Sequence, residues 1–135
     1  MEGRVVECRP VIHLDTNIVI WLHRNQLRRL SRDALRALEN ERPTVSGAVL
    51  VELAILYEGG GRRNELPHEL IEALGERYGL VLSPSPFNRV AAEAGSLGWT
   101  RDPFDRLIVA DAIASGAKLV TADSVILDHF ADAVW

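Results

Sequence analysis

Four carboxylates in this sequence, Asp15, Glu52, Asp105 and Asp123, have neighbours that suggest a shared chemical role. Asp15 follows the apolar run Val-Ile-His-Leu and Asp123 follows Leu-Val-Thr-Ala, so both are expected just after buried strands. In a parallel sheet, ligands bind beyond the carboxyl ends of the strands, which would bring these two acids to one edge. Each also has a structural interpretation, because aspartate is a common N-cap of a following helix.

Glu52 is the most informative of the four on physical grounds. It lies in a strongly apolar stretch that predicts a helix over residues 48–57. Its neighbours on the same helix face are all apolar: Ala48, Val49, Ile55 and Leu56. A carboxylate placed there loses hydration, so it is expected to stay protonated or to find a cation. The alternative is an ion pair with a distant arginine, because no arginine or lysine lies within one helical turn.

The run Asp-Pro-Phe-Asp-Arg at residues 102–106 opens another predicted helix. Asp102 fits the N-cap and Pro103 the first helical position, so we assign Asp102 a capping role. Asp105 lies on the helix stripe that is expected to face the sheet. Asp111 lies about 120° away around the helix and is expected to be a solvated or paired surface acid.

Four carboxylates brought together repel each other, and their pKa values rise unless cations lie between them. Oxygen ligands select hard ions, so the expected cofactor is Mg²⁺ or Mn²⁺ rather than Zn²⁺. Cys8 and the four histidines (His13, His23, His68 and His129) have no zinc-ligand spacing, and we expect the histidines to be structural or exposed. A divalent cation makes water more acidic and neutralises charge on a phosphodiester, which leaves proton transfer to water and carboxylates.

The hydrophobic pattern predicts an α/β fold in which strands alternate with helices. Short apolar runs predict strands over residues 11–14, 44–46, 80–82 and 118–121, and an edge strand over 133–135. Helices are expected over residues 16–23, from the N-cap Ser31 to about 41, and over 48–57, 67–77, 87–97, 103–115 and 124–130. This alternation predicts a mostly parallel sheet of four or five strands with helices on both faces.

Length and composition fit one globular domain over residues 1–135, with 47% hydrophobic and 25% charged residues. The net charge of −4 argues against a surface coated for nucleic acid, although a nuclease needs only a local basic path. No apolar run reaches the ~18 residues of a membrane helix, and no secretory signal is expected at the N-terminus. A single cysteine, Cys8, cannot form an internal disulfide, which fits a cytoplasmic protein.

Taken together, four segments of the sequence resemble the PIN-domain family, and most of all its VapC-type toxin ribonucleases of type II toxin–antitoxin systems. These segments are Leu-Asp-Thr-Asn at 14–17, the isolated Glu52, Arg-Asp-Pro-Phe-Asp-Arg at 101–106 and Val-Thr-Ala-Asp at 120–123. The resemblance covers nearly the whole chain, and the Asp-Pro-Phe-Asp-Arg run is its most specific motif. It implies an endoribonuclease that uses Mg²⁺ or Mn²⁺.

The resemblance also implies roles for particular residues and for partners. The metal-binding and catalytic acids would be Asp15, Glu52, Asp105 and Asp123, with supporting polar groups at Thr16, Asn17 and Thr121. By this resemblance the chain would form a homodimer and be neutralised by a small antitoxin, whose C-terminal segment wraps the toxin in this family. The apolar helices around residues 18–22 and 50–56 and the three tryptophans (Trp21, Trp99 and Trp135) are candidate contact surfaces, with core packing as the alternative.

Arginines near the site are candidates to contact RNA phosphates. In the alternative interpretation these arginines form only a solvated helix face and a loop. The candidates are Arg24, Arg28, Arg29, Arg32, Arg62 and Arg63.

Three other functions stay open from the sequence. One is a PIN nuclease in RNA processing or on DNA, and another is a module that binds RNA without cutting it. The third is a receiver-like signalling domain, in which Asp15 or Asp105 would accept a phosphoryl group. The only lysine, Lys118, begins a strand, which counts against that domain because it expects a lysine after its last strand.

Overall fold

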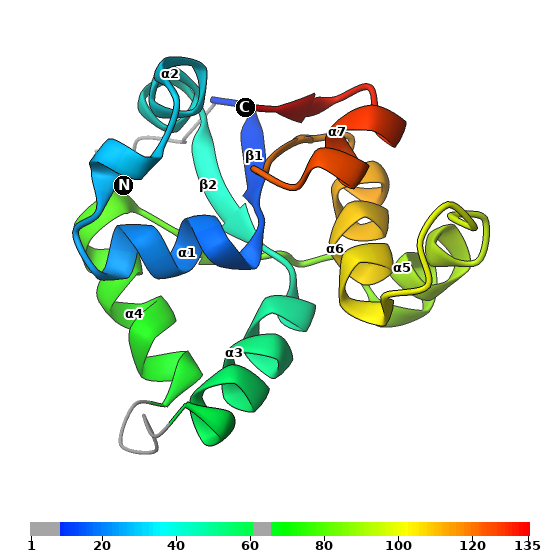
Figure 1. The fold of residues 1–135 in the computed structure, drawn as a ribbon, viewed down its shortest axis with the longest axis horizontal. Helices are drawn as coiled ribbons and strands as arrows, with labels where there is room; N and C mark the ends of the chain where they lie inside the picture. Colours follow the sequence, from blue (N-terminus) through cyan, green and yellow to red (C-terminus); the bar gives the residue numbers. More distant parts are fainter. Residues whose placement is uncertain (1–8, 61–65) are drawn as a thin grey trace, which may run out of the picture.

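A central parallel sheet organises the computed structural model, which describes residues 9–60 and 66–135 (Figure 1). Its strands are β1 (Val11–Leu14), β2 (Arg42–Val45), β3 (Val81–Leu82), β4 (Lys118–Val120) and β5 (Ala133–Val134). They lie in the spatial order β3-β2-β1-β4-β5, and every neighbouring pair is parallel. The predicted α/β class is confirmed, and the edge strand at the C-terminal end is present.

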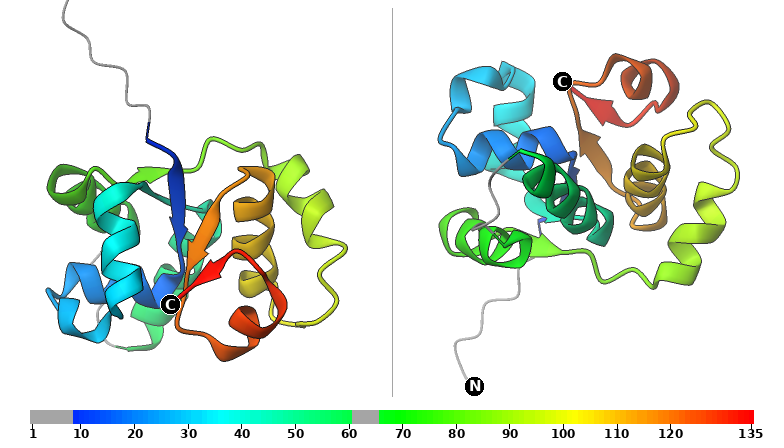
Figure 2. Two further views of the ribbon diagram at one scale, coloured as in Figure 1. Left: turned by 90° about the horizontal axis from the view of Figure 1, so that it is seen from above. Right: turned by 60° about the horizontal axis from the view of Figure 1, so that its bottom comes forward.

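Helices cover both faces of this sheet, as predicted. In Figures 1 and 2 one side carries α1 (Thr16–His23), α2 (Arg32–Asn40) and α4 (Pro67–Tyr78), and the other carries α5 (Phe87–Ala94) and α6 (Pro103–Ala114). The remaining helices are α3 (Gly47–Gly59), which follows β2, α7 (Ser124–His129), which joins β4 to β5, and the short 3-10 helix η1 (Leu27–Arg29). After β1, β2, β3 and β4, a helical crossover therefore carries the chain back to the end of the sheet where the next parallel strand begins.

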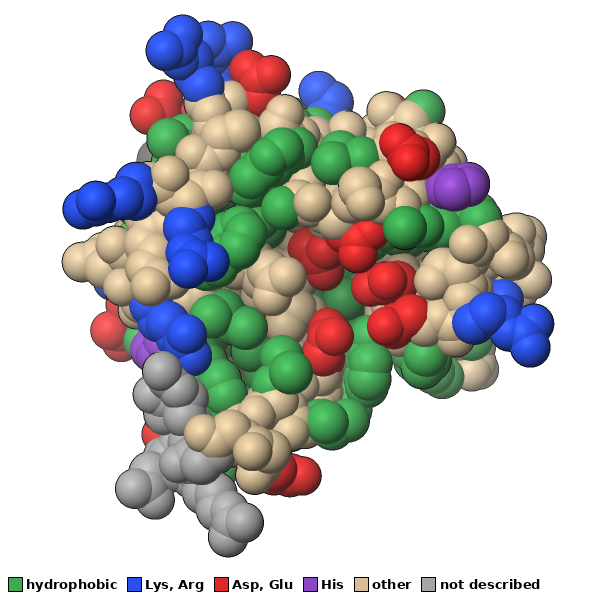
Figure 3. Space-filling view, in the orientation of Figure 1, with side chains coloured by type: hydrophobic (Ala, Val, Ile, Leu, Met, Phe, Trp, Pro, Cys, Tyr) green, Lys and Arg blue, Asp and Glu red, His purple; other side chains and the backbone are tan. Residues whose placement is uncertain are grey.

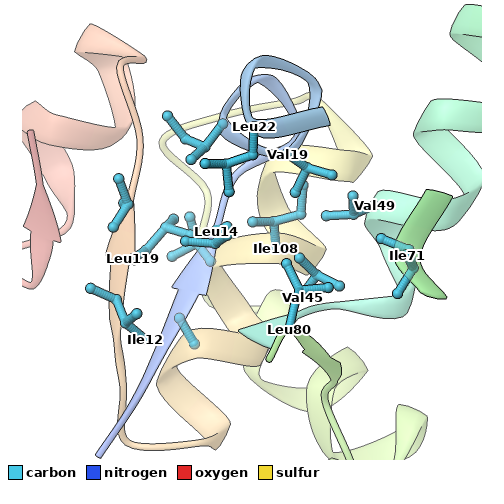
Figure 4. Close-up of a cluster of buried hydrophobic side chains, with 14 of the residues drawn as sticks. Ile12, Leu14, Val19, Leu22, Val45, Val49, Ile71, Leu80, Ile108 and Leu119 are labelled. Atoms are coloured by element: carbon cyan, nitrogen blue, oxygen red, sulfur yellow. The ribbon is translucent and has the colours of Figure 1, made fainter. Parts of the chain in front are cut away.

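The side chains of β1 show why both faces of the sheet are buried. Ile12 and Leu14 point to one face and are fully inaccessible, while His13 points to the other and is 1% exposed. Figure 4 shows the apolar cluster around the strands, with Leu22 of α1 and Ile108 of α6 brought against it. A parallel strand covered on both faces needs a continuous apolar run, and such runs are what the sequence contains.

Several helix ends follow local sequence signals. The Ser31 hydroxyl accepts the amide of Ala34 at 3.1 Å, so the predicted N-cap of α2 is confirmed. Gly116 has φ +63 just after α6, a left-handed conformation that glycine adopts without steric cost. Helix α5 stops at Ala94 rather than near residue 97, because Gly95 follows and glycine is a poor helix former.

Strand β2 differs from its prediction because it starts at Arg42 and contains Pro43. Proline lacks the amide that a ladder hydrogen bond needs, and it is tolerated where a strand is paired on one side only. β3 pairs with Thr44 and Val45, so Pro43 has a register partner in β1 but none in β3.

Asp111 was expected at the surface, and this expectation is wrong. Its side chain is only 3% exposed, because α5 packs along α6 and the segment joining β3 to α5 passes over it. The carboxylate accepts a hydrogen bond from the Ser83 hydroxyl at 2.7 Å and another from Ser115 at 3.3 Å. Two serine hydroxyls therefore compensate the burial of this acid.

Two further expectations concern residues outside the described part of the chain and the absence of a membrane helix. Cys8, Arg62 and Arg63 lie outside the described residues. In residues 9–60 and 66–135 no helix has the length and apolar character needed to cross a bilayer.

Leu53→Ala should destabilise the fold by about 2–5 kcal/mol, because Leu53 is fully buried in α3 and the substitution leaves a cavity. Val51→Ala is the matched control on the same helix, since Val51 is 53% exposed and its change should stay within about 0.5 kcal/mol. The free energy of unfolding in urea measures both. Equal destabilisation of the two variants would contradict the packing described for α3.

Candidate metal centre

Asp15 forms the buried centre of the predicted acidic site. It follows β1, is 8% exposed and caps α1, with Oδ1 accepting the amide of Thr16 at 2.8 Å. Its Oδ2 accepts the hydroxyl of Thr121 at 2.6 Å. Burial raises the pKa of Asp15, and these two hydrogen bonds oppose the rise because they stabilise the carboxylate.

Thr16 links Asp15 to the acid on α3. Its buried hydroxyl donates to Glu52 Oε1 at 2.5 Å, so the first turn of α1 is hydrogen bonded to the middle of α3. Glu52 is half-buried, and burial raises its pKa while the hydrogen bond from Thr16 lowers it. Among the described residues Glu52 forms no ion pair, so its polar partner is a threonine rather than the distant arginine considered above.

Glu52 is less buried than its apolar neighbours suggested. Ile55 is 52% exposed and Leu56 is 46% exposed, because α3 extends past the end of the sheet and buries only one of its sides. The desolvation expected for Glu52 is therefore present but partial.

Thr121 performs the corresponding role between β1 and β4. While its hydroxyl donates to Asp15, its oxygen accepts the amide of Asp123 at 3.0 Å. Asp123 caps α7, with Oδ1 accepting the amides of Val125 and Ile126. Because β1 and β4 are neighbours in the sheet, the two acids that follow them are held close together by one threonine.

Asp105 has the most strongly perturbed carboxyl group of the four. Burial raises its pKa to about 7, and four nearby charges add to the rise, in decreasing order Asp102, Asp15, Asp123 and Glu52. Carboxylates from four separate segments therefore act on the same group. No hydrogen bond joins the Asp105 carboxylate to another described residue.

Asp102 combines two roles that the sequence reasoning separated. It caps α6 as predicted, with Oδ1 accepting the amides of Phe104 and Asp105. Its charge is also the largest electrostatic contribution to the raised pKa of Asp105. The sequence signal for this second role is the spacing of three in the 102–106 run, which places both acids in one turn of helix.

The donor atoms of this site are carboxylate oxygens, which are the ligands that a hard divalent cation prefers. Glu52, Asp105 and Asp123 each keep at least one carboxylate oxygen without a hydrogen bond from another described residue. In Figure 3 acidic side chains gather near the middle of this face, with lysine or arginine at its edges. However, in residues 9–60 and 66–135 no group of three or more histidine, cysteine or acidic side chains is arranged to hold a metal ion. Ligation would therefore require rotation of these side chains.

The predicted supporting residues and the histidines differ in how deeply their side chains are buried. Thr16 and Thr121 are buried within the acidic site, whereas Asn17 is exposed and has no hydrogen bond to another described residue through its side chain. His68 and His129 are not buried. His13 is buried, and this burial lowers its pKa, although the nearby Asp111 charge raises it.

Comparison with known proteins supports the same fold. The model of the PIN domain family matches residues 12–132. A toxin–antitoxin complex from Klebsiella pneumoniae contains a chain with 19% identity and TM-score 0.60, covering 92% of this chain and 96% of that one. VapBC2 from Rickettsia felis, bound to a DNA fragment from its promoter, gives 20% identity and TM-score 0.58, covering 87% and 92%.

VapBC-1 from nontypeable Haemophilus influenzae gives 20% identity and TM-score 0.55, covering 93% of this chain and 96% of that one. A comparison with curated protein sequences found no match. Since the family model spans nearly the whole chain, the chain belongs to the PIN domain family.

The raised pKa of Asp105 predicts a pH-dependent stability in metal-free buffer. From about pH 4 to about pH 7 the folded protein keeps a proton on Asp105 that the unfolded chain has released. The contribution of this group to stability therefore falls as pH rises through that window and is constant above it. Asp105→Asn removes the effect, so the variant should gain stability over the parent between these two pH values.

Urea midpoints measured in EDTA across this pH range test the prediction. Asp128→Asn, a change at an exposed acid of α7, should run parallel to the parent. A constant difference between Asp105→Asn and the parent at every pH would contradict the assigned shift.

Proposed function

We propose that this PIN-domain chain is a Mg²⁺- or Mn²⁺-dependent endoribonuclease and acts as the toxin of a type II toxin–antitoxin pair. The observation that carries the proposal is the convergence of negative charge on Asp105, whose pKa burial and four neighbouring carboxylates raise to about 7. A group of acids with this mutual repulsion favours binding of a divalent cation, because the cation neutralises it.

The residues proposed to hold the metal are Asp15, Glu52, Asp105 and Asp123. When bound, a divalent cation lowers the pKa of water and places positive charge beside the scissile phosphate. Thr121 and Thr16 keep Asp15 oriented, since one donates to it through a hydroxyl and the other through a backbone amide. Thr16 also holds Glu52, which fixes α3 relative to the end of β1.

Proton transfer in this site falls to carboxylates and water. His13, the histidine nearest in sequence to Asp15, faces the opposite side of β1 from Leu14 and bonds to Ser115.

The solved relatives support the toxin assignment over the alternatives. Three neighbours in fold come from structures described as VapBC or toxin–antitoxin complexes. Membership of the PIN domain family argues against a receiver-like domain. A PIN nuclease outside toxin biology would have the same acids, and a gene for a short DNA-binding protein immediately upstream would favour the toxin.

A protein partner, the antitoxin or a second copy in a homodimer, belongs to the same proposal. Of the two apolar helices considered from the sequence, α1 contributes Ile18 and Leu22 to the core, where both are fully buried. In contrast, α3 exposes Val51, Ile55 and Leu56. The second helix is therefore the one with apolar surface for a partner. The three tryptophans are partly buried and pack against the core.

Asp105→Asn should reduce RNA cleavage by roughly 100-fold or more while the fold is kept, because it removes a proposed metal ligand with little change in shape. Cleavage of RNA by the parent should require Mg²⁺ or Mn²⁺ and stop in EDTA. Asp128→Asn is the control, since this exposed acid on α7 lies outside the proposed ligand set.

The same assay decides between the proposed activity and its alternatives. Cleavage by Asp105→Asn at the parental rate, or cleavage that continues in EDTA, would show the metal-site proposal to be wrong. Binding of RNA without any cleavage would indicate the binding module, and cleavage of DNA in preference to RNA would indicate a different nuclease.

Arg24→Gln combined with Arg28→Gln should weaken RNA binding and flatten its dependence on salt. Both arginines are exposed at the end of α1 and in η1, whereas Arg29 already lies over the Trp21 ring at 5.5 Å. Removing an arginine that binds one phosphate should reduce the slope of log K against log salt by about 0.7. Arg36→Gln on α2 is the control, and an unchanged slope in the double variant would leave these arginines as a solvated surface.

A further inference from the structure

A cavity of about 350 Å³ lies between α3, α5, α6 and the segment that joins β3 to α5. None of the four proposed metal ligands lines it. Most of its wall is apolar and comes from the three helices: Ala48, Val51, Phe87, Val90, Phe104 and Leu107. Among the described residues that line it, Asp111 is the one with an ionisable side chain. The charge of this cavity is therefore set by a single carboxylate.

Asp111 offers the cavity a carboxylate oxygen that has no partner. Its Oδ1 accepts both hydroxyl hydrogen bonds, from Ser83 and from Ser115. Its Oδ2 accepts none from another described residue, and within residues 9–60 and 66–135 no basic side chain forms an ion pair with this carboxylate. Oδ2 is also not sealed from solvent, unlike the unpaired Nδ1 of His13. A side chain that is only 3% exposed therefore keeps one charged oxygen accessible.

The direction of the hydroxyl protons shows that the wall around Asp111 accepts hydrogen bonds. Ser83 and Ser115 each use their proton on Asp111. Ser115 Oγ also lies 3.2 Å from Ser85 Oγ, so the proton between these two serines comes from Ser85. Ser83 and Ser85 line the cavity, and both of their protons are therefore already used. Oxygen lone pairs remain on this wall, so a ligand bound against it must be a donor.

Aromatic side chains favour a positively charged donor. Phe87 begins α5 and is 68% exposed, while Phe104 lies in the first turn of α6 and packs against the core. An aromatic ring attracts a cation that lies over its face. A carboxylate in apolar surroundings without a counter-charge costs free energy, and a cation recovers part of that cost. The cavity therefore combines the features that a cation with an apolar body requires.

We propose that this cavity binds a small organic amine in its protonated form. The ammonium group donates hydrogen bonds to Asp111 Oδ2 and to the oxygen of Ser85, and the apolar body of the amine contacts Phe87 and Phe104. The volume is near the lower end of ligand pockets, which span about 300–1,000 Å³, so the ligand is a small molecule. This binding does not depend on the proposed nuclease activity.

Isothermal titration calorimetry of the full chain with phenethylamine, in metal-free buffer at neutral pH, tests the proposal. Saturable binding is expected. Phenethyl alcohol, which has the same ring but no charge, should bind roughly tenfold more weakly or less, and phenylacetate, an anion, should not bind.

Asp111→Asn should weaken binding of phenethylamine roughly tenfold or more, because it removes the charge and keeps the size of the side chain and an acceptor for the two serines. Asp128→Asn is the matched control, since it removes the same charge from an exposed acid of α7. Asp105→Asn should also bind the amine as the parent does, which separates this cavity from the acidic site.

Phe87→Ala provides a second variant in case Asp111→Asn disturbs the fold, because an exposed side chain can be removed with little effect on packing. It should weaken binding about threefold or more. The proposal is overturned by any of four results. These are no saturable binding of phenethylamine, equal binding of the alcohol or of phenylacetate, parental affinity in both Asp111→Asn and Phe87→Ala, and loss of binding in Asp105→Asn equal to that in Asp111→Asn.

Discussion

Repulsion between carboxylates at the carboxyl edge of the sheet is the interaction on which the proposed site depends. Asp102, Asp15, Asp123 and Glu52 all raise the pKa of Asp105, so ionisation of any one of them costs free energy in the others. The fold tolerates this because hydrogen bonds to Asp15 and Glu52 are stronger in their ionised forms. These hydrogen bonds therefore favour the ionised forms of Asp15 and Glu52 against the repulsion from their neighbours.

Two threonines connect this charge to the architecture. Thr16 begins α1 and reaches across to α3, while Thr121 follows β4 and reaches back to the end of β1. The adjacency of β1 and β4 in the sheet makes the second contact possible, and the packing of α1 against α3 makes the first. Each threonine is buried, so its hydrogen bond is shielded from water.

Three aspartates in this chain both cap a helix and add negative charge to the acidic site. Asp15, Asp102 and Asp123 each accept backbone amides at a helix N-terminus and each contribute charge to the acidic site. The positive end of a helix dipole stabilises an aspartate at this place, which partly offsets the repulsion from its neighbours.

The sequence by itself determined most of what is local. Continuous apolar runs predict β1 and β4, Ser31 and Gly116 predict the start of α2 and the end of α6, and residue type and spacing single out the four acids. Tertiary structure decided what depends on contact between distant segments. Asp111 is buried because the residues around Ser83 cross α6, Glu52 is hydrogen bonded to Thr16 of another helix, and Asp102 adds its charge to the acidic site. Helical period gives the direction of a side chain but not what covers it, because burial is set by packing between segments far apart in the chain.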